Sequence, residues 1–384
     1  MPGLVSYSIS IRIRYNTPMK VIIICESLRI GGIERLTLDQ SYQLNTLGIE
    51  NEIILIGKVT NNNVPTFAIN ESELIIKKAV KYTEIPGRRI NQINKLRKII
   101  NRQQDVLIVS HSLRGTVLVW LIRLFTRQDF KIFTTIHQLS SLSAPVQRLK
   151  RYFYSQFTDK LFFFSIAAIN DWIYNQNFFV RAIANRKDLT LLRNGVFLPR
   201  IIDSNPVVES NKNERNRLIF IGRLTTWKGL EIFSNLSKIN LLNEYDFLLI
   251  TPTNPSELFS EFDAQLLSRF NFEIGKSISQ IKFKSGDIHV YPANYGSKNM
   301  FIEGISINVL EMACLGIPSL VTIGGSNTWP ELLDLGIVKE VDWSNLSEVA
   351  DCINKLSTSR DVNKINEYLG LIDIRNNINT ILNS

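Results

Sequence analysis

Residues 19–38 read MKVIIICESLRIGGIERLTL, and this stretch decides the fold. It opens with a strand that is apolar on both faces, Lys20–Cys25, and passes through Gly31 and Gly32 into a helix expected over Ile33–Leu47. Strands that are apolar on both faces are typical of buried parallel sheets. The same order of strand and helix recurs along the chain, which predicts an α/β fold of two doubly wound, Rossmann-like domains.

The other expected elements share these two patterns. Short runs rich in Ile, Val and Phe predict further strands at 52–57, 105–110, 131–136, 160–164 and 189–192, then at 218–221, 246–251, 270–274, 287–291, 319–323 and 338–341. Helices are expected at 89–103, 113–125, 144–157 and 167–177, then at 229–239, 257–268, 307–315 and 346–356. Ligands bind at the carboxyl ends of the strands in such sheets, so two domains in tandem predict a shared cleft.

The domain boundaries follow from local composition. A polar segment with prolines, 196–216, separates the two sets of strands and is expected to be a linker. The N-terminal domain then covers 19–195 and the C-terminal domain 217–360, with an extension at 1–18. A last helix, 361–384, follows the completed second sheet and is expected to pack back on the first domain.

The composition narrows the class of protein. With 45% hydrophobic and 21% charged residues, the chain is not a disordered polymer, a collagen-like chain or a disulfide scaffold. The three cysteines lie far apart without a C-x-x-C pair, which argues against a structural zinc site. The net charge of +9 is uneven, because residues 1–200 hold 28 Lys and Arg against 13 Asp and Glu, and the rest hold 16 against 22. A basic first half predicts an anionic partner on that side.

The segment FIEGISINVLEMACLGIP, 301–318, holds the sharpest candidate site. Glu303 and Glu311 are separated by seven residues, and a helix is expected to begin near Ser306, which places Glu303 in the loop before it and Glu311 on the helix. The amides of Gly304, Ile305 and Ser306 would lie at the positive end of that helix, where anions bind. Carboxylates accept from sugar hydroxyls and amides donate to a diphosphate, so the pattern fits a phosphorylated sugar. The alternative is that both glutamates are solvated on the surface. The glycine and the helix start that lie between Glu303 and Glu311 make this alternative weaker.

A second candidate site follows the strand that ends at Gly222. In the loop IGRLTTWKG, 221–229, Arg223 and Lys228 stand before the next helix. Two cations at the carboxyl end of a strand can neutralise a diphosphate leaving group. Taken alone, this motif is better explained as two surface cations on a loop.

The histidines give a third set of candidates. His111 and His137 each follow an expected strand, so both fall at the predicted cleft, and for His111 structural and functional roles are equally open. His289 lies inside a strand, which favours a structural role. Gly31 and Gly32 can turn the chain into a helix whose N-terminus meets a phosphate or sugar. They do not form G-x-G-x-x-G, so a dinucleotide site is not supported.

In this order, the pieces resemble glycosyltransferase family 4, a family of retaining sugar transferases with the GT-B fold. The resemblance covers nearly everything after Met19. The matching pieces are IGGIER near Gly31, TTIHQ around His137, LLRNGV around Asn194, IGRLTTWKG at 221–229, EGISINVLEMACLGIP at 303–318 and GGSNTWPELL at 324–333. The ordered set, rather than any one piece, makes chance an unlikely source of the match.

The resemblance implies roles on the donor side. Arg223 and Lys228 match the pair that holds the donor diphosphate. Glu303 matches the carboxylate that contacts the donor-sugar hydroxyls, and Gly304, with its neighbours, matches amides beside the sugar and phosphate. Glu311 matches the carboxylate that binds the nucleotide ribose.

The resemblance also implies roles on the other side of the cleft. His137 matches a histidine close to the transferred sugar. Gly31 and Gly32 match the loop that borders the phosphates and the acceptor. The implied activity is retaining transfer of a hexose-type sugar from a nucleotide-diphosphate sugar to a glycan or lipid-linked acceptor, in the biosynthesis of cell-surface polysaccharide or glycolipid.

Some positions depart from the family pattern. Ser306 stands where the family often has glycine, which could alter the choice of sugar. Residues 271–284 match the usual base-binding region poorly, so the nucleobase is not assigned. No D-x-D motif occurs, and we expect metal-independent transfer without a cofactor.

The basic clusters of the first half predict a membrane surface as a partner. Residues 77–81, 87–102 and 147–157 mix cations with apolar side chains, which suits an anionic membrane. No segment is long enough to span a bilayer, and residues 1–18 lack the apolar core of a signal peptide. We therefore expect a cytoplasmic protein, peripheral on the inner face of the membrane. Solvated helix faces are the alternative interpretation.

Two other functions are compatible with parts of the sequence. A sugar-nucleotide epimerase of the same fold would also bind a nucleotide sugar between two such domains. A nucleic-acid-binding protein would explain the basic charge, but the chain has no recognisable nucleic-acid motif, and we expect no nucleic-acid partner.

Overall fold

The structure is a computed structural model of the whole chain. It describes residues 19–26, 32–57, 80–85, 87–101, 105–126, 129–139, 145–164, 166–174, 188–198, 201, 214–224, 228–251, 269–276, 278–293, 302–303, 305–323, 330–356 and 365–384. The expected extension at 1–18, most of the linker and the helix expected at 257–268 lie outside these residues.

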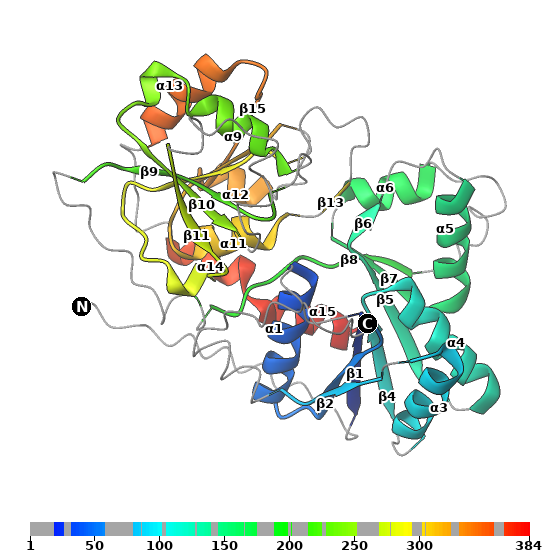
Figure 1. Ribbon diagram of the computed structural model, residues 1–384. Coiled ribbons are helices and arrows are strands. Elements are labelled where there is room, and N and C mark those ends of the chain that lie inside the picture. Colours follow the sequence, from blue (N-terminus) through cyan, green and yellow to red (C-terminus); the bar gives the residue numbers. More distant parts are fainter. Residues whose placement is uncertain are drawn as a thin grey trace.

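The first domain is built on a parallel sheet of seven strands in the order β3-β2-β1-β4-β5-β7-β8. The strands are β1 Lys20–Cys25, β2 Asn51–Leu55, β3 Tyr82–Glu84, β4 Val106–Ser110, β5 Lys131–Ile136, β7 Lys160–Phe163 and β8 Asp188–Leu191. The helices are α1 Gly32–Thr46, α3 Arg89–Ile100, α4 Leu113–Thr126, α5 Pro145–Phe157 and α6 Ile166–Tyr174. Figure 1 shows this domain from blue to green.

The second domain repeats the plan with six parallel strands in the order β11-β10-β9-β12-β14-β15. The strands are β9 Arg217–Ile221, β10 Asp246–Thr251, β11 Phe270–Ile274, β12 Ile288–Tyr291, β14 Ser319–Thr322 and β15 Val338–Val341. The helices are α9 Leu230–Leu236, α11 Ile307–Cys314, α12 Pro330–Asp334 and α13 Leu346–Leu356, with 3-10 turns at Asn240–Leu242 and Ile278–Gln280. The expected α/β architecture of two doubly wound sheets is confirmed.

Strand β1 shows why the apolar runs predict buried strands. Val21 and Ile23 point into one hydrophobic core, while Ile22 and Ile24 point into the core on the other face of the sheet. All six residues of the strand are buried. Because helices cover both faces of a parallel sheet, successive side chains must be apolar even though they alternate in direction.

The C-terminal segment differs from the single helix expected over 361–384. It forms two helices, α14 Ile365–Ile372 and α15 Ile374–Leu382, which are divided at Asp373. Ile372 belongs to the core of the second domain, whereas Ile374 and Ile378 belong to that of the first, where α15 lies beside α1 (Figure 1). At the division a side chain on Gly195 would lie 2.6 Å from the Ile374 backbone, so the two segments can approach only at a glycine.

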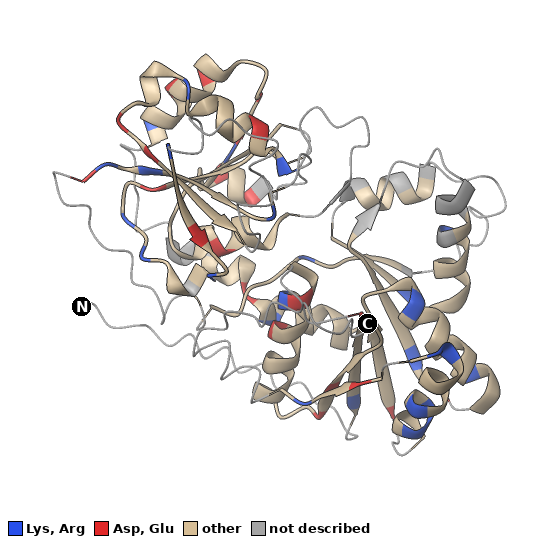
Figure 2. Ribbon diagram, viewed as in Figure 1, with Lys and Arg blue, Asp and Glu red and all other residues tan. Residues whose placement is uncertain are grey.

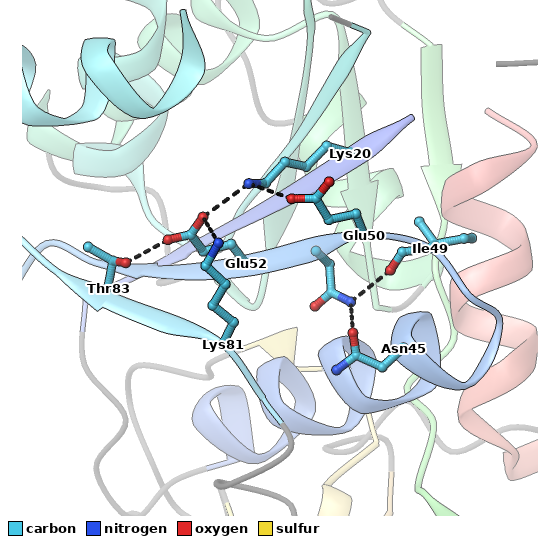
Figure 3. Close-up of polar contacts among 8 residues, drawn as sticks. Lys20, Asn45, Ile49, Glu50, Glu52, Lys81 and Thr83 are labelled. Atoms are coloured by element: carbon cyan, nitrogen blue, oxygen red, sulfur yellow. Dashed lines mark hydrogen bonds and ion pairs between the residues drawn. The ribbon is translucent and has the colours of Figure 1, made fainter. Parts of the chain in front are cut away.

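The amino-terminal edge of the first sheet carries a buried ion pair (Figure 3). Lys20 Nζ lies 3.1 Å from Glu52 and 3.0 Å from Glu50, and Thr83 donates to Glu52 at 2.6 Å. Burial alone would raise the pKa of Glu52, but the hydrogen bonds from Thr83 and Lys20 outweigh burial, and the pKa is lowered. Glu52 is therefore held as a carboxylate inside the sheet.

No helix within the described residues combines the length and the apolar character that a bilayer crossing requires.

Candidate functional site

Two histidines meet at the carboxyl edge of the first sheet. His111 follows β4 directly, His137 follows β5 directly, and these two strands are neighbours. His111 Nδ1 lies 2.8 Å from His137 Nε2, and Thr135 Oγ1 lies 2.7 Å from the first and 3.0 Å from the second. The His137 ring also stacks on Phe164, with 4.6 Å between ring centroids. Both expected cleft histidines thus belong to one cluster.

A chain of buried amides links this pair to the C-terminal helix. The backbone carbonyl of Arg193 can only accept, so the Asn377 amide nitrogen, 2.8 Å away, must donate to it. The Asn377 oxygen then accepts from the Gln40 amide nitrogen at 2.8 Å. This leaves the Gln40 oxygen facing His111 Nε2 at 2.9 Å, where it accepts a proton from the ring. One carbonyl therefore sets the direction of every bond up to His111.

The same chain fixes where His137 carries its proton. Neutral His111 has its proton on Nε2, so its Nδ1 is bare and must accept. The donor is His137 Nε2–H, either directly or through the Thr135 hydroxyl, which lies within reach of both rings. In its neutral form, His137 is therefore protonated on Nε2 and bare on Nδ1. Among the described residues, none lies within hydrogen-bonding distance of His137 Nδ1.

Burial keeps both rings neutral. It lowers the pKa of His111 to about 3, and it lowers the pKa of His137 well below the ordinary value, with a further contribution from His111. Near neutral pH, then, His137 is a hydrogen-bonding group with a lone pair on Nδ1 and not an imidazolium. That suits binding of a hydroxyl group rather than proton donation.

A two-stranded sheet joins the domains next to His137. Strand β6, Gln138–Leu139, pairs antiparallel with β13, Ile302–Glu303, so that Glu303 lies opposite Gln138. This pairing brings the backbone of Glu303 to the residue that follows His137. Glu303 was expected in a loop, and the strand is a correction of that expectation. The Glu303 side chain, Gly31 and Gly304 lie outside the described residues.

The second carboxylate of the motif, Glu311, lies on α11 and is fully buried. Arg35 Nη1, on α1 of the first domain, donates to both of its oxygens at 2.9 Å. Gly32, which begins α1, is exposed, and it approaches Ile307 at the start of α11. The carboxylate expected to bind a ribose is thus also a contact between the domains.

The cations expected at the donor side lie on the loop after β9. Arg223 is exposed, while Lys228 is half-buried and donates to the Tyr291 hydroxyl at 2.6 Å. Gly229 follows with a φ of +79°, and a side chain there would lie 2.4 Å from the Pro292 carbonyl oxygen. Only glycine fits this position, so the chain turns sharply directly after Lys228.

Two asparagines fix the start of α11. Asn308 donates to the Ile221 carbonyl at 3.0 Å, which ties this helix to the end of β9, directly before Gly222. From the first domain, Asn194 donates to the Ile305 carbonyl at 2.7 Å. Ser306 is the N-cap residue as expected, but its side chain makes no capping hydrogen bond. The start of α11 therefore lies between the end of β9 and the first domain.

A further ion pair crosses between the domains. Arg193, after β8, lies 2.6 Å from Glu331 on α12. Its hydrogen bond lowers the pKa of Glu331, so this carboxylate remains charged. Arg193 also supplies the carbonyl that orients Asn377.

Two other residues considered from the sequence, His289 and Arg151, have structural roles. His289 lies in β12 with no exposed surface, hydrogen-bonded to Ser319 at 2.9 Å, and burial lowers its pKa to about 3. In the basic cluster at 147–157, Arg151 is only 3% exposed and its guanidinium lies 5.3 Å from the Trp172 ring. Arg151 is thus a core residue and does not belong to a basic surface, which corrects that part of the membrane expectation.

Several site residues receive no role from the sequence. Gln40, Tyr291 and Asn377 lie outside the quoted motifs, whereas Arg35 and Asn194 lie in the IGGIER and LLRNGV pieces without an assigned role. The nearest signal is the face of α1, where Thr37, Asp39, Gln40, Ser41 and Gln43 are buried although polar. Buried polar side chains need partners, so such a face indicates a hydrogen-bonding network.

Comparison with known proteins gives structural matches alone. No family model and no curated protein sequence matches the chain. A glycosyltransferase from Rickettsia africae is 14% identical with a TM-score of 0.68, over 95% of this chain and 97% of the other. HepE from Anabaena, in complex with UDP-glucose, is 11% identical with a TM-score of 0.66, over 95% and 98%. TarM from S. aureus, in complex with fondaparinux, alpha-GlcNAc-glycerol and UDP, is 9% identical with a TM-score of 0.67, over 95% and 99%.

The chain has the GT-B fold. Each match extends over nearly the whole of both chains, so both domains are shared. At these identities the likeness establishes the fold alone.

Proposed function

We propose that the chain is a retaining glycosyltransferase, which moves a hexose-type sugar from a nucleotide-diphosphate sugar to a glycan or lipid-linked acceptor in cell-surface polysaccharide or glycolipid biosynthesis. The observation that carries this proposal is the meeting of three elements at one edge. The Lys228 loop and the start of α11 lie on one side, and the neutral His137 lies on the other, joined by the β6–β13 pairing. The solved structures with UDP or UDP-glucose bound support the same class of donor.

The donor diphosphate would lie between Lys228, Arg223 and the first amides of α11. Negative charge develops on this leaving group as the glycosidic bond breaks, and fixed cations and amides stabilise it without reorganising. Glu303 would accept from the sugar hydroxyls, Glu311 from the ribose, and bare Nδ1 of His137 from a further hydroxyl of the sugar. Gly222 and Gly32 border this space.

We propose that these groups act without a metal ion. Arg223, Lys228 and the amides of α11 supply the positive charge that a metal would otherwise provide. The test is activity of the purified chain in EDTA. Unchanged turnover supports the proposal, whereas loss of turnover with recovery on adding Mg²⁺ or Mn²⁺ contradicts it.

The basic first domain supports an acceptor at an anionic membrane surface, on the inner face of the membrane. Lys95, Arg97 and Lys98 are exposed on α3, and Figure 2 shows Lys and Arg along α3 and α4. Each basic residue near such a surface contributes about 1 kcal/mol. Flotation with liposomes that contain phosphatidylglycerol tests this, and absence of binding at low salt would remove the membrane from the proposal.

The experiment that tests the proposed function is a panel of UDP-, GDP- and ADP-sugars scored by thermal stabilisation. A ligand that binds the native state raises the apparent melting temperature, so one nucleotide class should stand out. The stabilising donor is then incubated with acceptor extracts, and the anomeric configuration of the product is read by NMR. Retention supports the mechanism. An epimerised donor formed without acceptor would instead favour an epimerase, and no stabilisation by any nucleotide sugar would exclude both.

A further inference from the structure

A cavity of about 580 Å³ lies in the first domain, apart from the donor-side groups. Among the described residues, its walls are Gly87, Arg88, Arg89 and Arg114, and none of these is acidic. Arg88 and Arg89 stand where α3 begins, and Arg114 stands in the first turn of α4. Since His111 lies three residues before Arg114, the cavity opens at the same carboxyl edge of the sheet as the histidine pair.

Arg114 is held in place by a buried glutamine. Gln92 is 1% exposed, and its amide nitrogen donates to the carbonyls of Ile56 and Ile85, both at 2.8 Å. Those two carbonyls leave the Gln92 oxygen to accept from Arg114 Nη2 at 2.7 Å. Because this partner is a neutral amide, it orients the guanidinium without neutralising its charge.

The Arg114 guanidinium has further N–H donors besides the one that Gln92 accepts. Its Nε is closed to solvent, so Nε is not one of the groups that a ligand in the open cavity would meet. The guanidinium presents its donors as a planar fork, which matches the oxygens of a phosphate.

The start of α3 adds to the positive field of the cavity. Its N-cap residue, Arg88, makes no side-chain capping bond, so the first amides of this twelve-residue helix keep their donors. Arg88 and Arg89 are both exposed at this end. Three guanidinium groups and a helix N-terminus concentrate positive charge around the cavity, and none of its described wall residues is acidic, so an anion bound there would be attracted.

We propose that this cavity, here called the arginine pocket (Gly87, Arg88, Arg89 and Arg114), binds a phosphate ester carried by the acceptor substrate. The inference rests on the proposed function, which is what makes the ligand an acceptor. The pocket lies on the first domain, whereas Lys228 and the donor side belong to the second. Its volume falls in the range of small-molecule sites, roughly 300–1,000 Å³, which leaves room for groups next to the phosphate. The phosphate could belong to a lipid headgroup or to a soluble phosphorylated glycan.

The test compares two triple variants of the full chain with equal loss of charge. R88Q/R89Q/R114Q removes the guanidinium groups of the arginine pocket. K95Q/R97Q/K98Q removes three exposed cations farther along the same α3 helix. The first probe is inorganic pyrophosphate, measured by equilibrium dialysis. The second probe is vesicles of phosphatidylcholine with phosphatidylglycerol, measured by sedimentation with and without pyrophosphate as competitor.

We expect the pocket variant to lose pyrophosphate affinity by at least about tenfold, the scale of one charge-assisted hydrogen bond, while the control stays within about threefold. Equal affinities in the two variants would overturn the proposal. If vesicle binding falls in the pocket variant relative to wild type and pyrophosphate competes with vesicles for the wild type, the phosphate is a lipid headgroup. If the pocket variant binds vesicles as well as wild type does, it belongs to a soluble ester. The K95Q/R97Q/K98Q control serves the pyrophosphate measurement alone, because its three cations belong to the proposed membrane surface.

Two further measurements separate the possible failures. R88Q/R89Q changes exposed residues alone and keeps the test valid if the Arg114 substitution impairs folding, and it should lose at least about threefold in pyrophosphate affinity. Stabilisation by the donor that the nucleotide-sugar panel identifies should be the same in the pocket variant and the wild type. If the wild type binds pyrophosphate in the arginine pocket but no nucleotide sugar stabilises it, the proposed function fails and the pocket stands.

Discussion

Arg35 and Glu311 form an ion pair between the two domains, with one guanidinium nitrogen 2.9 Å from each carboxylate oxygen. Glu311 has no exposed surface, and the Arg35 side chain is 21% exposed. A buried carboxylate is stable only when paired and hydrogen-bonded. Arg35 therefore stabilises the buried side chain of a proposed ribose ligand and couples it to the position of the first domain.

We expect Arg35→Met to lower the free energy of unfolding by about 3 kcal/mol, because it leaves Glu311 buried without this cation. R35M/E311M should recover most of that loss, since both charges of the pair are then removed. Urea denaturation measures both. E311M and the double variant should still bind the donor nucleotide far more weakly than wild type. A single R35M variant as stable as wild type would contradict this role of the pair.

Lys228 is expected to stabilise the leaving diphosphate. Removing one such group lowers turnover by roughly 10²–10³ fold in comparable sites, so Lys228→Ala should lower kcat on that scale. Tyr291→Phe removes the hydroxyl that accepts from Lys228 at 2.6 Å, and it should lower kcat less, because the cation remains. Lys238, on the same domain, supplies the control K238A, for which unchanged kcat is expected. Near-normal turnover of K228A would remove Lys228 from the site.

The direction of the amide chain predicts the tautomer of His137. Gln40→Met removes the acceptor that faces His111 Nε2. His111 is then free to carry its proton on Nδ1 and donate to His137, which would move the His137 proton to Nδ1. The two tautomers have well-separated ¹⁵N shifts, and the chain has only three histidines, so selective ¹⁵N-histidine labelling reads them directly.

The matched control is Gln43→Met, the same change on the same helix at another buried position. It should leave the His137 shifts at wild-type values. Wild-type His137 with its proton on Nδ1 would contradict the direction of the chain. An unchanged His137 spectrum in Q40M would show that Gln40 does not set the tautomer.

The sequence predicts the parts of this molecule that follow from local patterns. β1, β5 and β10 have the expected bounds, because each is a short apolar run that is buried on both sides of a sheet. β11 and β15 also have the expected bounds, although they are edge strands with exposed residues. The strands that sequence analysis missed lack that pattern. β3 holds two exposed residues out of three, and β6 and β13 are two residues long. Their pairing depends on the approach of the domains and has no local signal.

The site divides in the same way. His111 and His137 could be placed at strand ends, but their contact depends on β4 and β5 being neighbours, which is a property of the sheet order. Arg35 and Glu311 are 276 residues apart, and Gln40 and Asn377 are 337 apart. From the sequence, a polar residue on an amphipathic helix is expected to face solvent. The packing of α15 and α11 on α1 shows that these four residues are instead paired across elements.

The buried histidines predict a loss of stability in mild acid. His111 and His289 have pKa values of about 3 in the fold against 6.5 ordinarily. Below about pH 6.5 the unfolded chain binds a proton on each of these histidines and the native chain does not. The free energy of unfolding therefore falls by about 1.4 kcal/mol per pH unit for each histidine, until the pH approaches the pKa in the folded chain. Glu52 and Glu331 have lowered pKa values, so their contribution to stability is lost only below about pH 4.5.

Chemical denaturation from pH 7.5 to 5 measures this effect. His289→Gln removes one buried histidine far from the histidine pair, and it should reduce the slope below about pH 6.5 by about 1.4 kcal/mol per pH unit. Its stability at pH 7.5 is the reference for the substitution itself. A slope equal to that of wild type would mean that His289 does not stay neutral in the fold.

The Lys20–Glu52 pair at the opposite edge of the sheet should act through stability alone. Both side chains are nearly buried, with 4% and 6% exposure, so Lys20→Met should lower the free energy of unfolding by about 3 kcal/mol. K20M/E52L should recover most of this, because an apolar pair replaces the buried charges. The control is Glu50→Gln, since Glu50 is 62% exposed and its bond to Lys20 is worth at most about 1 kcal/mol. Donor binding should stay at the wild-type level in all three variants, and a K20M variant no less stable than E50Q would show that burial does not set the strength of this pair.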